Sequence, residues 1–184
     1  MELDAEGLVK ATCGGDEAAA GRLVELFYER IYAFLRRLAG NDEDAADLTQ
    51  RTFSEVWEAL PGFAGRSSVA SWMHSIAYHI YADWRRADSH AELRLDEWWA
   101  EHPGRDAGPD EQATASDMAA VLYGAVDRLE ADLRETVHLH YYQELTLAET
   151  AEAMGVATST VKYRLRQALA QLQKRLADKQ TLPR

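Results

Sequence analysis

Apolar residues recur along this chain at the three- and four-residue spacing of an α-helix. From about Asp16 to Leu38 they form one continuous stripe, and the charged residues lie mostly on the other sides. The members of this stripe are Leu23, Leu26, Phe27, Ile31, Phe34, Leu35 and Leu38. Few segments show the period of two that is typical of strands. The sequence therefore predicts an all-α fold.

Helix-breaking residues divide the first half of the chain into three helices. The letters GND at 40–42 end the first helix, and PG at 61–62 ends a second one that runs from about 44 to 60. A third stripe begins at Val69 and closes on two arginines at 85–86. Because three amphipathic helices can bury their stripes against one another, residues 1–87 are expected to form a small N-terminal helical bundle.

The helical periodicity fades between Asp88 and Asp117. This segment holds nine acidic residues, two prolines and two glycines, a composition typical of a linker. From Met118 onward two amphipathic segments follow, and two shorter helices complete the chain. The sequence thus predicts two small helical domains, residues 1–87 and 118–184, joined by an acidic flexible linker at residues 88–117.

The last part of the chain has the pattern of a helix-turn-helix. Thr146 precedes Glu149 by three residues, which is the spacing of a capping box at the start of a short helix. Gly155 permits a left-handed turn after that helix, and Val161 can anchor the helix that follows. The C-terminal domain is therefore expected to be a helix-turn-helix domain.

Charge separates this helix-turn-helix from the rest of the chain. The chain carries a net charge of -11, yet residues 154–184 hold seven Lys and Arg against one acidic residue. A basic helix on an acidic protein favours DNA binding, although a solvated basic face is a competing interpretation. On the second helix, the residues predicted to face or flank the major groove are Ser159, Thr160, Lys162, Tyr163, Arg164, Arg166 and Gln167.

Several other classes of protein are disfavoured by the composition. A single cysteine, Cys13, allows no disulfide within the chain. The N-terminus lacks the pattern of a signal peptide, and no run approaches the roughly 18 apolar residues that span a bilayer. A cytoplasmic location without membrane insertion is therefore expected.

Enzymatic chemistry finds no support in the motifs. His138 and His140 are two residues apart, about 200° around a helix, so they cannot share a metal as residues four apart can. No glycine-rich phosphate loop or nucleophile motif is present. We therefore expect no catalytic residue, no metal, no cofactor and no small-molecule substrate.

The chain resembles the extracytoplasmic-function (ECF) sigma factors of bacterial RNA polymerase, a branch of the sigma-70 family, over nearly its whole length. The segments "DEDAADLTQRTFSEVWEAL" and "SWMHSIAYHIYADWRR" are similar to region two of that family. The segment "LRETVHLHYYQELTLAETAEAMGVATSTVKYRLRQAL" is similar to region four. The resemblance implies two helical domains and an alternative sigma factor that acts without enzymatic activity of its own.

The resemblance also implies partners and binding residues. Core RNA polymerase would bind the exposed face of the second helix, at Asp47, Gln50, Arg51, Ser54 and Glu55. Unpaired bases of the minus-ten element would be held by Phe63, Arg66, Ser67, Ser68, Trp72, Tyr78 and His79. The helix that begins near Ser159 would read the minus-thirty-five element of promoter DNA. An anti-sigma factor is expected to control the protein.

Physical reasoning supports only part of the minus-ten assignment. Aromatic side chains such as Phe63 and Tyr78 offer stacking surfaces for unpaired bases near Arg66. Trp72, however, lies on the apolar stripe and can equally be a core residue. Family members often have Asn where His79 stands and Arg where Ser75 stands, so the identity of the captured base is left open.

Two alternative functions remain open at the level of the sequence. One is a sigma mimic that sequesters an anti-sigma factor without binding DNA. The other is a conventional helix-turn-helix regulator with an N-terminal sensor or oligomerisation domain. A conventional regulator would bind its operator alone, whereas a sigma factor would bind promoters well only with core polymerase.

Overall fold

The structure is a computed structural model that describes residues 4–87 and 116–180. Within these ranges the chain is helical and contains no strand, which confirms the predicted all-α fold. The predicted linker, residues 88–117, lies almost entirely outside the described residues. The elements are α1 (Ala5–Cys13), α2 (Glu17–Ala39), α3 (Asp42–Ala59), the 3-10 turn η1 (Leu60–Gly62), α4 (Val69–Ala87), α6 (Ser116–Asp127), α7 (Ala131–Val137), the π-helical turn η2 (His138–Tyr142), α8 (Leu147–Met154) and α9 (Thr158–Gln180).

Local capping fixes where the predicted helices begin and end. The side chain of Asp16 accepts hydrogen bonds from the backbone of Ala18 and Ala19 at the start of α2. Gly40 ends α2 in the left-handed conformation, with φ 76°. Asn41 then accepts a bond from the backbone of Asp44 at 2.8 Å and starts α3. These bonds place the helices within about two residues of their predicted limits.

Two helices differ from the sequence-based expectation. The short helix α1 was not predicted; it buries Leu8 and Val9 against the first bundle. The final helix α9 was expected to be short but has 23 residues, as many as α2. Its apolar stripe extends through Leu165 and Leu172, so packing continues well past the helix-turn-helix.

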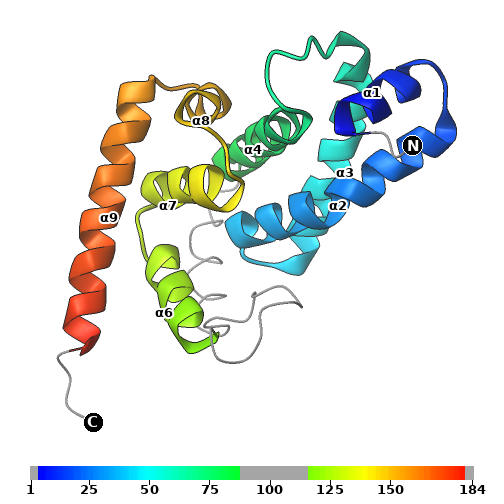
Figure 1. Ribbon diagram of the computed structural model, residues 1–184. Helices are drawn as coiled ribbons and strands as arrows, with labels where there is room; N and C mark the ends of the chain where they lie inside the picture. The colour runs from blue at the N-terminus through cyan, green and yellow to red at the C-terminus, as the bar shows by residue number, and fades with distance from the viewer. Residues whose placement is uncertain (1–3, 88–115, 181–184) are drawn as a thin grey trace.

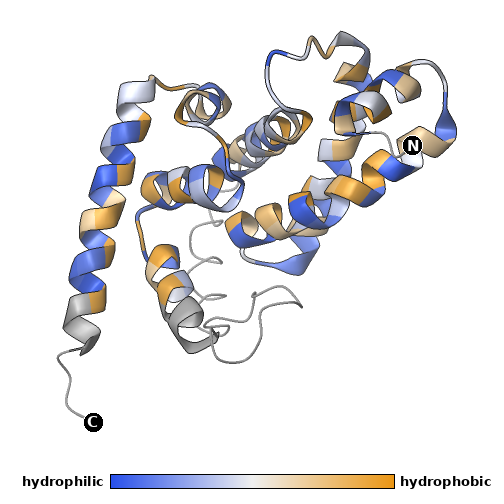
Figure 2. Ribbon diagram, viewed as in Figure 1, coloured by the Kyte–Doolittle hydropathy of each residue, from blue (hydrophilic) through white to orange (hydrophobic). Residues whose placement is uncertain are grey.

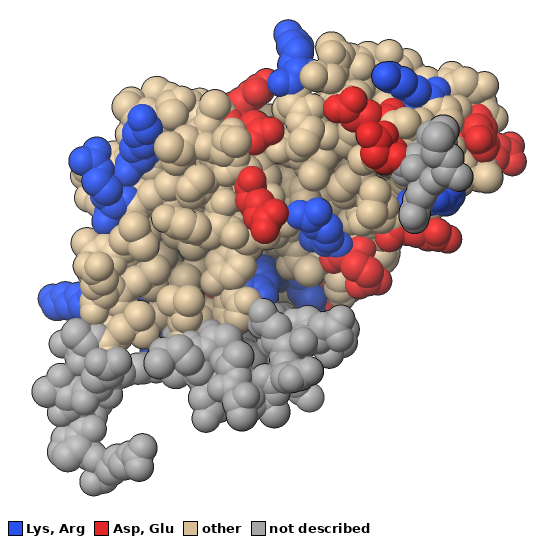
Figure 3. Space-filling model, viewed as in Figure 1, with Lys and Arg blue, Asp and Glu red and all other residues tan. Residues whose placement is uncertain are grey.

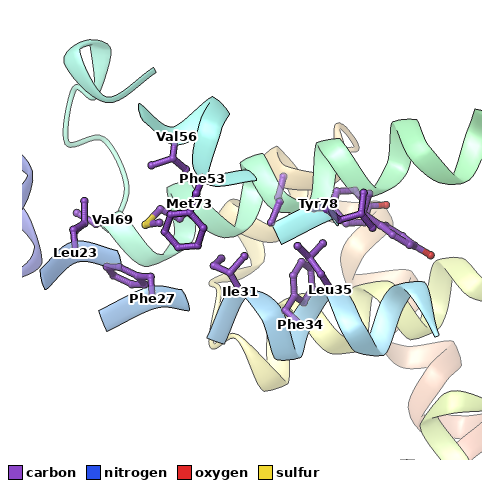
Figure 4. Packing of buried hydrophobic residues seen from close by; sticks show 14 of the residues in the cluster. Leu23, Phe27, Ile31, Phe34, Leu35, Phe53, Val56, Val69, Met73 and Tyr78 are labelled. Carbon is purple, nitrogen blue, oxygen red and sulfur yellow. The ribbon is translucent and has the colours of Figure 1, made fainter. Parts of the chain in front are cut away.

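Each helix carries one apolar side, and these sides meet in the interior (Figures 1 and 2). Figure 4 shows side chains of α2, α3 and α4 converging, among them Phe27, Phe53 and Met73. Leu26 is the exception on the predicted stripe, because it lies at the edge of the packed face and is 50% exposed. A second cluster joins α6, α7, α8 and α9 around Val161.

The two halves of the described chain pack directly on one another. In Figure 1, α7 and α8 lie against α4, and α9 lies on the far side of α7. Three residues of the second half, Leu139, Leu145 and Ala153, belong to the same hydrophobic cluster as α2 and α4. Figure 3 shows basic side chains along α9, while many acidic side chains lie over the rest of the visible face.

Candidate nucleic-acid and protein interfaces

The helix-turn-helix has the geometry that the sequence predicts. The backbone N–H of Thr146 donates to the Glu149 carboxylate at 2.8 Å, and the N–H of Glu149 donates to the Thr146 hydroxyl at 3.2 Å. This capping box starts α8. Gly155 ends α8 in the left-handed region at φ 63°, where a side chain would be strained. Val161 is fully buried and anchors α9.

The solvent-facing side of α9 presents hydrogen-bonding groups suited to DNA. Tyr163 is 56% exposed, and its hydroxyl accepts a bond from the amide of Gln167 at 2.6 Å. Lys162 and Arg166 are exposed, and no ion pair joins either one to another described residue. Ser159 is exposed and Thr160 is half-buried at the start of the helix. The seven predicted residues therefore share one helix, and five of them are exposed.

Arg164 differs from its basic neighbours because it is paired with a residue of the neighbouring helix α7. Its guanidinium forms an ion pair with Asp132 at the start of α7, and its side chain is half-buried. The two residues are 32 positions apart, so no local pattern could have revealed the pair. Arg164 thus orients α9 against α7 and is less available for a phosphate than Lys162 or Arg166.

The predicted minus-ten residues divide into an accessible group and a buried one. Phe63 and Trp72 are half-buried and pack ring against ring, with centroids 4.9 Å apart. Arg66 and Ser68 are exposed, Ser67 is half-buried, and His79 is exposed on α4. The Ser68 hydroxyl caps α4 by accepting the N–H of Ser71 at 3.0 Å. Except for His79, which lies in the middle of α4, these residues lie in the loop before α4 or in its first turn.

Tyr78 lies elsewhere, buried between the two halves of the chain. It is only 7% exposed, and its hydroxyl donates to the Glu135 carboxylate of α7 at 2.7 Å. Burial raises the pKa of Tyr78 and the neighbouring Glu135 raises it further, so the phenol stays protonated and donates. In this conformation Tyr78 cannot reach a DNA base. The sequence analysis missed Glu135 altogether.

The five predicted polymerase-binding residues form one exposed face of α3. Asp47, Gln50 and Ser54 line a groove of about 700 Å³ between α2 and α3. Its apolar lining includes Tyr28 of α2 and Trp57 of α3, which sequence reasoning did not assign to any site. The remaining two predicted residues, Arg51 and Glu55, are exposed beside the groove. An apolar floor with a polar rim is typical of a protein-binding surface.

No group of three or more metal-binding side chains occurs in the described ranges. The same ranges contain no helix long and apolar enough to cross a bilayer.

Comparison with known proteins places these surfaces in a family. Residues 23–90 match the domain family Sigma-70 region 2, and residues 119–172 match Sigma-70, region 4. The ECF RNA polymerase sigma factor RpoE of Cereibacter sphaeroides is 31% identical over 166 residues, covering 88% of this chain and 88% of RpoE. The chain belongs to the ECF sigma factors of the sigma-70 family. As a sigma factor it is a transcription initiation protein rather than an enzyme.

Other relatives agree with this assignment. The ECF sigma factor SigE of Mycolicibacterium smegmatis is 30% identical over 167 residues, covering 89% of this chain but only 65% of SigE. Among solved structures, the sigma factor RpoE of Bartonella quintana, in complex with the anti-sigma factor NepR, superposes with a TM-score of 0.66. That match covers 85% of this sigma factor and 96% of the Bartonella chain at 22% identity, and it supports the fold.

Proposed function

We propose that this sigma factor binds core RNA polymerase and directs transcription from promoters with a minus-ten and a minus-thirty-five element. The observation that carries the proposal is the order of the two matched regions: region 2 precedes region 4 in one chain, and region 4 presents an exposed basic helix. A conventional helix-turn-helix regulator would need no region 2. We assign residues 1–87 to minus-ten and polymerase binding and residues 118–184 to minus-thirty-five binding, with 88–117 as the linker.

In the second half of the chain, we propose that the N-terminal part of α9 binds the minus-thirty-five element in the major groove. Arg166 and Gln167 carry groups that can bond base edges in the major groove, and Lys162 can contact a phosphate. The exposed hydroxyl of Tyr163 lies on the same side. The surrounding positive charge supplies the attraction that an acidic protein otherwise lacks.

In the first half, the groove between α2 and α3 is the proposed contact with core polymerase. Trp57 and Tyr28 provide an apolar surface of the kind that dominates binding energy at interfaces, and Gln50 and Asp47 provide a polar rim. We propose that the loop from Phe63 to Ser68, together with Trp72 and His79, binds the unpaired bases of the minus-ten element.

An anti-sigma factor is proposed as a further partner. The Bartonella relative is described in complex with the anti-sigma factor NepR, and this supports an inhibitor of the same class here. Together, the proposed partners locate the protein in the cytoplasm, where promoter DNA and polymerase are found.

Run-off transcription with bacterial core polymerase tests the proposal directly. A genomic promoter pool would be transcribed with and without the full chain, and the transcripts sequenced. New start sites that share a spaced pair of upstream motifs would support a sigma factor. Failure to stimulate core, combined with tight binding of DNA by the chain alone, would indicate a conventional regulator. Failure combined with binding to an anti-sigma protein would indicate a decoy.

A further inference from the structure

Two polar side chains on the exposed side of α9 are hydrogen-bonded to one another. Tyr163 and Gln167 are four residues apart, so they lie next to each other on the same face of the helix. The Gln167 amide nitrogen donates to the Tyr163 hydroxyl oxygen at 2.6 Å. Because the side chains of a helix lean toward its N-terminus, the glutamine reaches back over the tyrosine. The two residues, here called the Tyr-Gln pair, therefore form one polar surface in the first half of α9.

The packing of α9 does not require this pair. The buried side of the helix is made by other residues, among them Val161, Leu165 and Ala168. Both members of the Tyr-Gln pair are exposed. A ring left in water adds little to stability, because only apolar area that is removed from water contributes. Packing therefore gives no reason for a tyrosine and a glutamine at these two positions, whereas a ligand that approaches the exposed face would contact both.

The hydrogen bond determines which groups of the amide are free to bind a ligand. A glutamine amide carries two N–H donors and one carbonyl acceptor, and a rotation of about 180° exchanges its two ends. A freely rotating glutamine can therefore offer a donor to guanine or thymine, an acceptor to cytosine, or both to adenine. Here one N–H is held by Tyr163, and the described residues give the Gln167 side chain no other hydrogen bond. One N–H and the carbonyl oxygen remain for a ligand.

A fixed donor beside a fixed acceptor matches one base better than the other three. Adenine presents the N7 acceptor and the N6 amino donor side by side in the major groove. Guanine presents two acceptors there, so its O6 would face the Gln167 carbonyl oxygen without a proton between them. Cytosine and thymine each satisfy only one of the two amide groups. An amide held in this orientation therefore favours adenine.

We infer that the Tyr-Gln pair selects adenine at one base pair of the minus-thirty-five element, with Gln167 contacting the base and Tyr163 positioning its amide. This inference rests on the proposed function, because α9 is assigned to that element there. Tyr163 acts through Gln167, since its hydroxyl holds the N–H that would otherwise be free to turn toward another base. Removal of the Tyr163 hydroxyl should therefore relax the choice of base at that one position.

Binding of the holoenzyme to a promoter library tests the inference. Core polymerase and the full chain would be assembled, and each base pair of the minus-thirty-five element would be varied in turn. We expect the wild type to prefer adenine at one position about tenfold over each other base, as one bidentate contact allows. Tyr163→Phe should reduce this preference to about threefold or less. Tyr141→Phe removes the hydroxyl of another exposed tyrosine, in η2, and should leave the preference as it is.

A change of base preference gives an independent measurement. Gln167→Glu keeps the size of the side chain but replaces its donor with a second acceptor, because an ionised carboxylate only accepts hydrogen bonds. The preferred base at the same position should then change from adenine to cytosine, whose N4 amino group donates. On the DNA side, 7-deazaadenine removes only the N7 acceptor, and it should weaken binding of the wild type at this position and at no other adenine of the element. A residue that merely supports the fold would not change which base is preferred.

The possible outcomes separate the inference from the proposed function. An equal adenine preference in the wild type and Tyr163→Phe would overturn the positioning role. A wild-type preference for guanine or thymine would mean that the amide faces the other way, and it would overturn the choice of adenine. If the holoenzyme neither binds nor transcribes any promoter, the proposed function fails. Selection of random duplex DNA by the full chain alone would then test the pair, and a selected site without an adenine that depends on Tyr163 would overturn the inference too.

Discussion

Three basic residues of α9 lie within five positions, yet their surroundings give them different roles. Arg164 is paired with Asp132 and half-buried, while Lys162 and Arg166 extend into solvent. An arginine that is already paired with a carboxylate must break that ion pair to bind a phosphate, so its net contribution to the free energy of DNA binding is small. We therefore expect the two exposed residues to carry most of the DNA recognition that the sequence assigned to all three.

Substituting Arg166 and Lys162 one at a time should distinguish sequence-specific base contacts from electrostatic attraction to the DNA phosphates. Arg166→Ala is expected to cost about 1–3 kcal/mol of discrimination between upstream elements, because a base contact is sequence-specific. Lys162→Ala should weaken binding to all promoters alike and make the salt dependence shallower. Binding of the holoenzyme to a panel of promoter variants at several salt concentrations would measure both. Equal losses on every promoter for the two variants would contradict the assignment.

At the scale of elements, the turn between α8 and α9 sets the angle of α9, the proposed minus-thirty-five helix. Gly155 adopts φ 63° with open space around its α-carbon, so only backbone strain opposes a side chain there. Asn tolerates this conformation better than Ala does. We therefore expect Gly155→Ala to lower the free energy of unfolding by about 1 kcal/mol and Gly155→Asn to lower it less. Denaturant unfolding would compare them, and a larger loss with Asn would contradict this account.

The groove between α2 and α3 allows a second test at this scale. Gln50→Arg places a long charged side chain over Tyr28 and Trp57, which should weaken binding to core polymerase about tenfold or more. Glu58→Arg introduces the same side chain on an exposed position of α3 that does not line the groove. Competition against a labelled sigma factor would measure both. Similar losses would indicate that charge alone, rather than the groove, decides binding.

Elements with strong local signals could be predicted, and those that depend on distant contacts could not. The helix-turn-helix follows from Thr146, Glu149 and Gly155, which act within a few residues. Helix α1 has nine residues and little stability of its own, because its burial of Leu8 and Val9 depends on α2. Glu135 gives no local sign that it will be buried, since its partners Tyr78 and Arg85 are 50 or more positions away.

At the scale of the whole molecule, the sequence predicted two units but not how they meet. The exposed residues of α3 and α9 were found because each lies on the polar side of an amphipathic helix. Tyr78 was predicted to bind DNA because its aromatic ring could stack on a base. In the structure that ring is buried between the two halves, and its hydroxyl donates to Glu135. A residue at such an interface looks like a surface residue in either unit taken alone. Sequence patterns within one helix cannot distinguish the two cases.

Burial of His74 should make the folded molecule sensitive to acid. The ring is fully buried in α4 against Phe34, and Nδ1 is 2.7 Å from the carbonyl oxygen of Ala70. Burial lowers the pKa of His74 from 6.5 to about 4 in the folded state. The unfolded chain therefore binds more protons between these values, so the stability due to neutral His74 is present above pH 6.5 and is lost as the pH falls toward 4.

Between pH 7 and pH 5 this loss should amount to about 2 kcal/mol from His74 alone. Burial also lowers the pKa of His138, which adds to the loss in the same direction. Denaturant unfolding at each pH would measure the dependence. His74→Gln should make the free energy of unfolding depend less on pH, because the side chain that gains a proton on unfolding has been removed. His79→Gln, at an exposed position of the same helix, should leave the slope as it is. If the two variants had the same pH dependence as the wild type, His74 would not be the source.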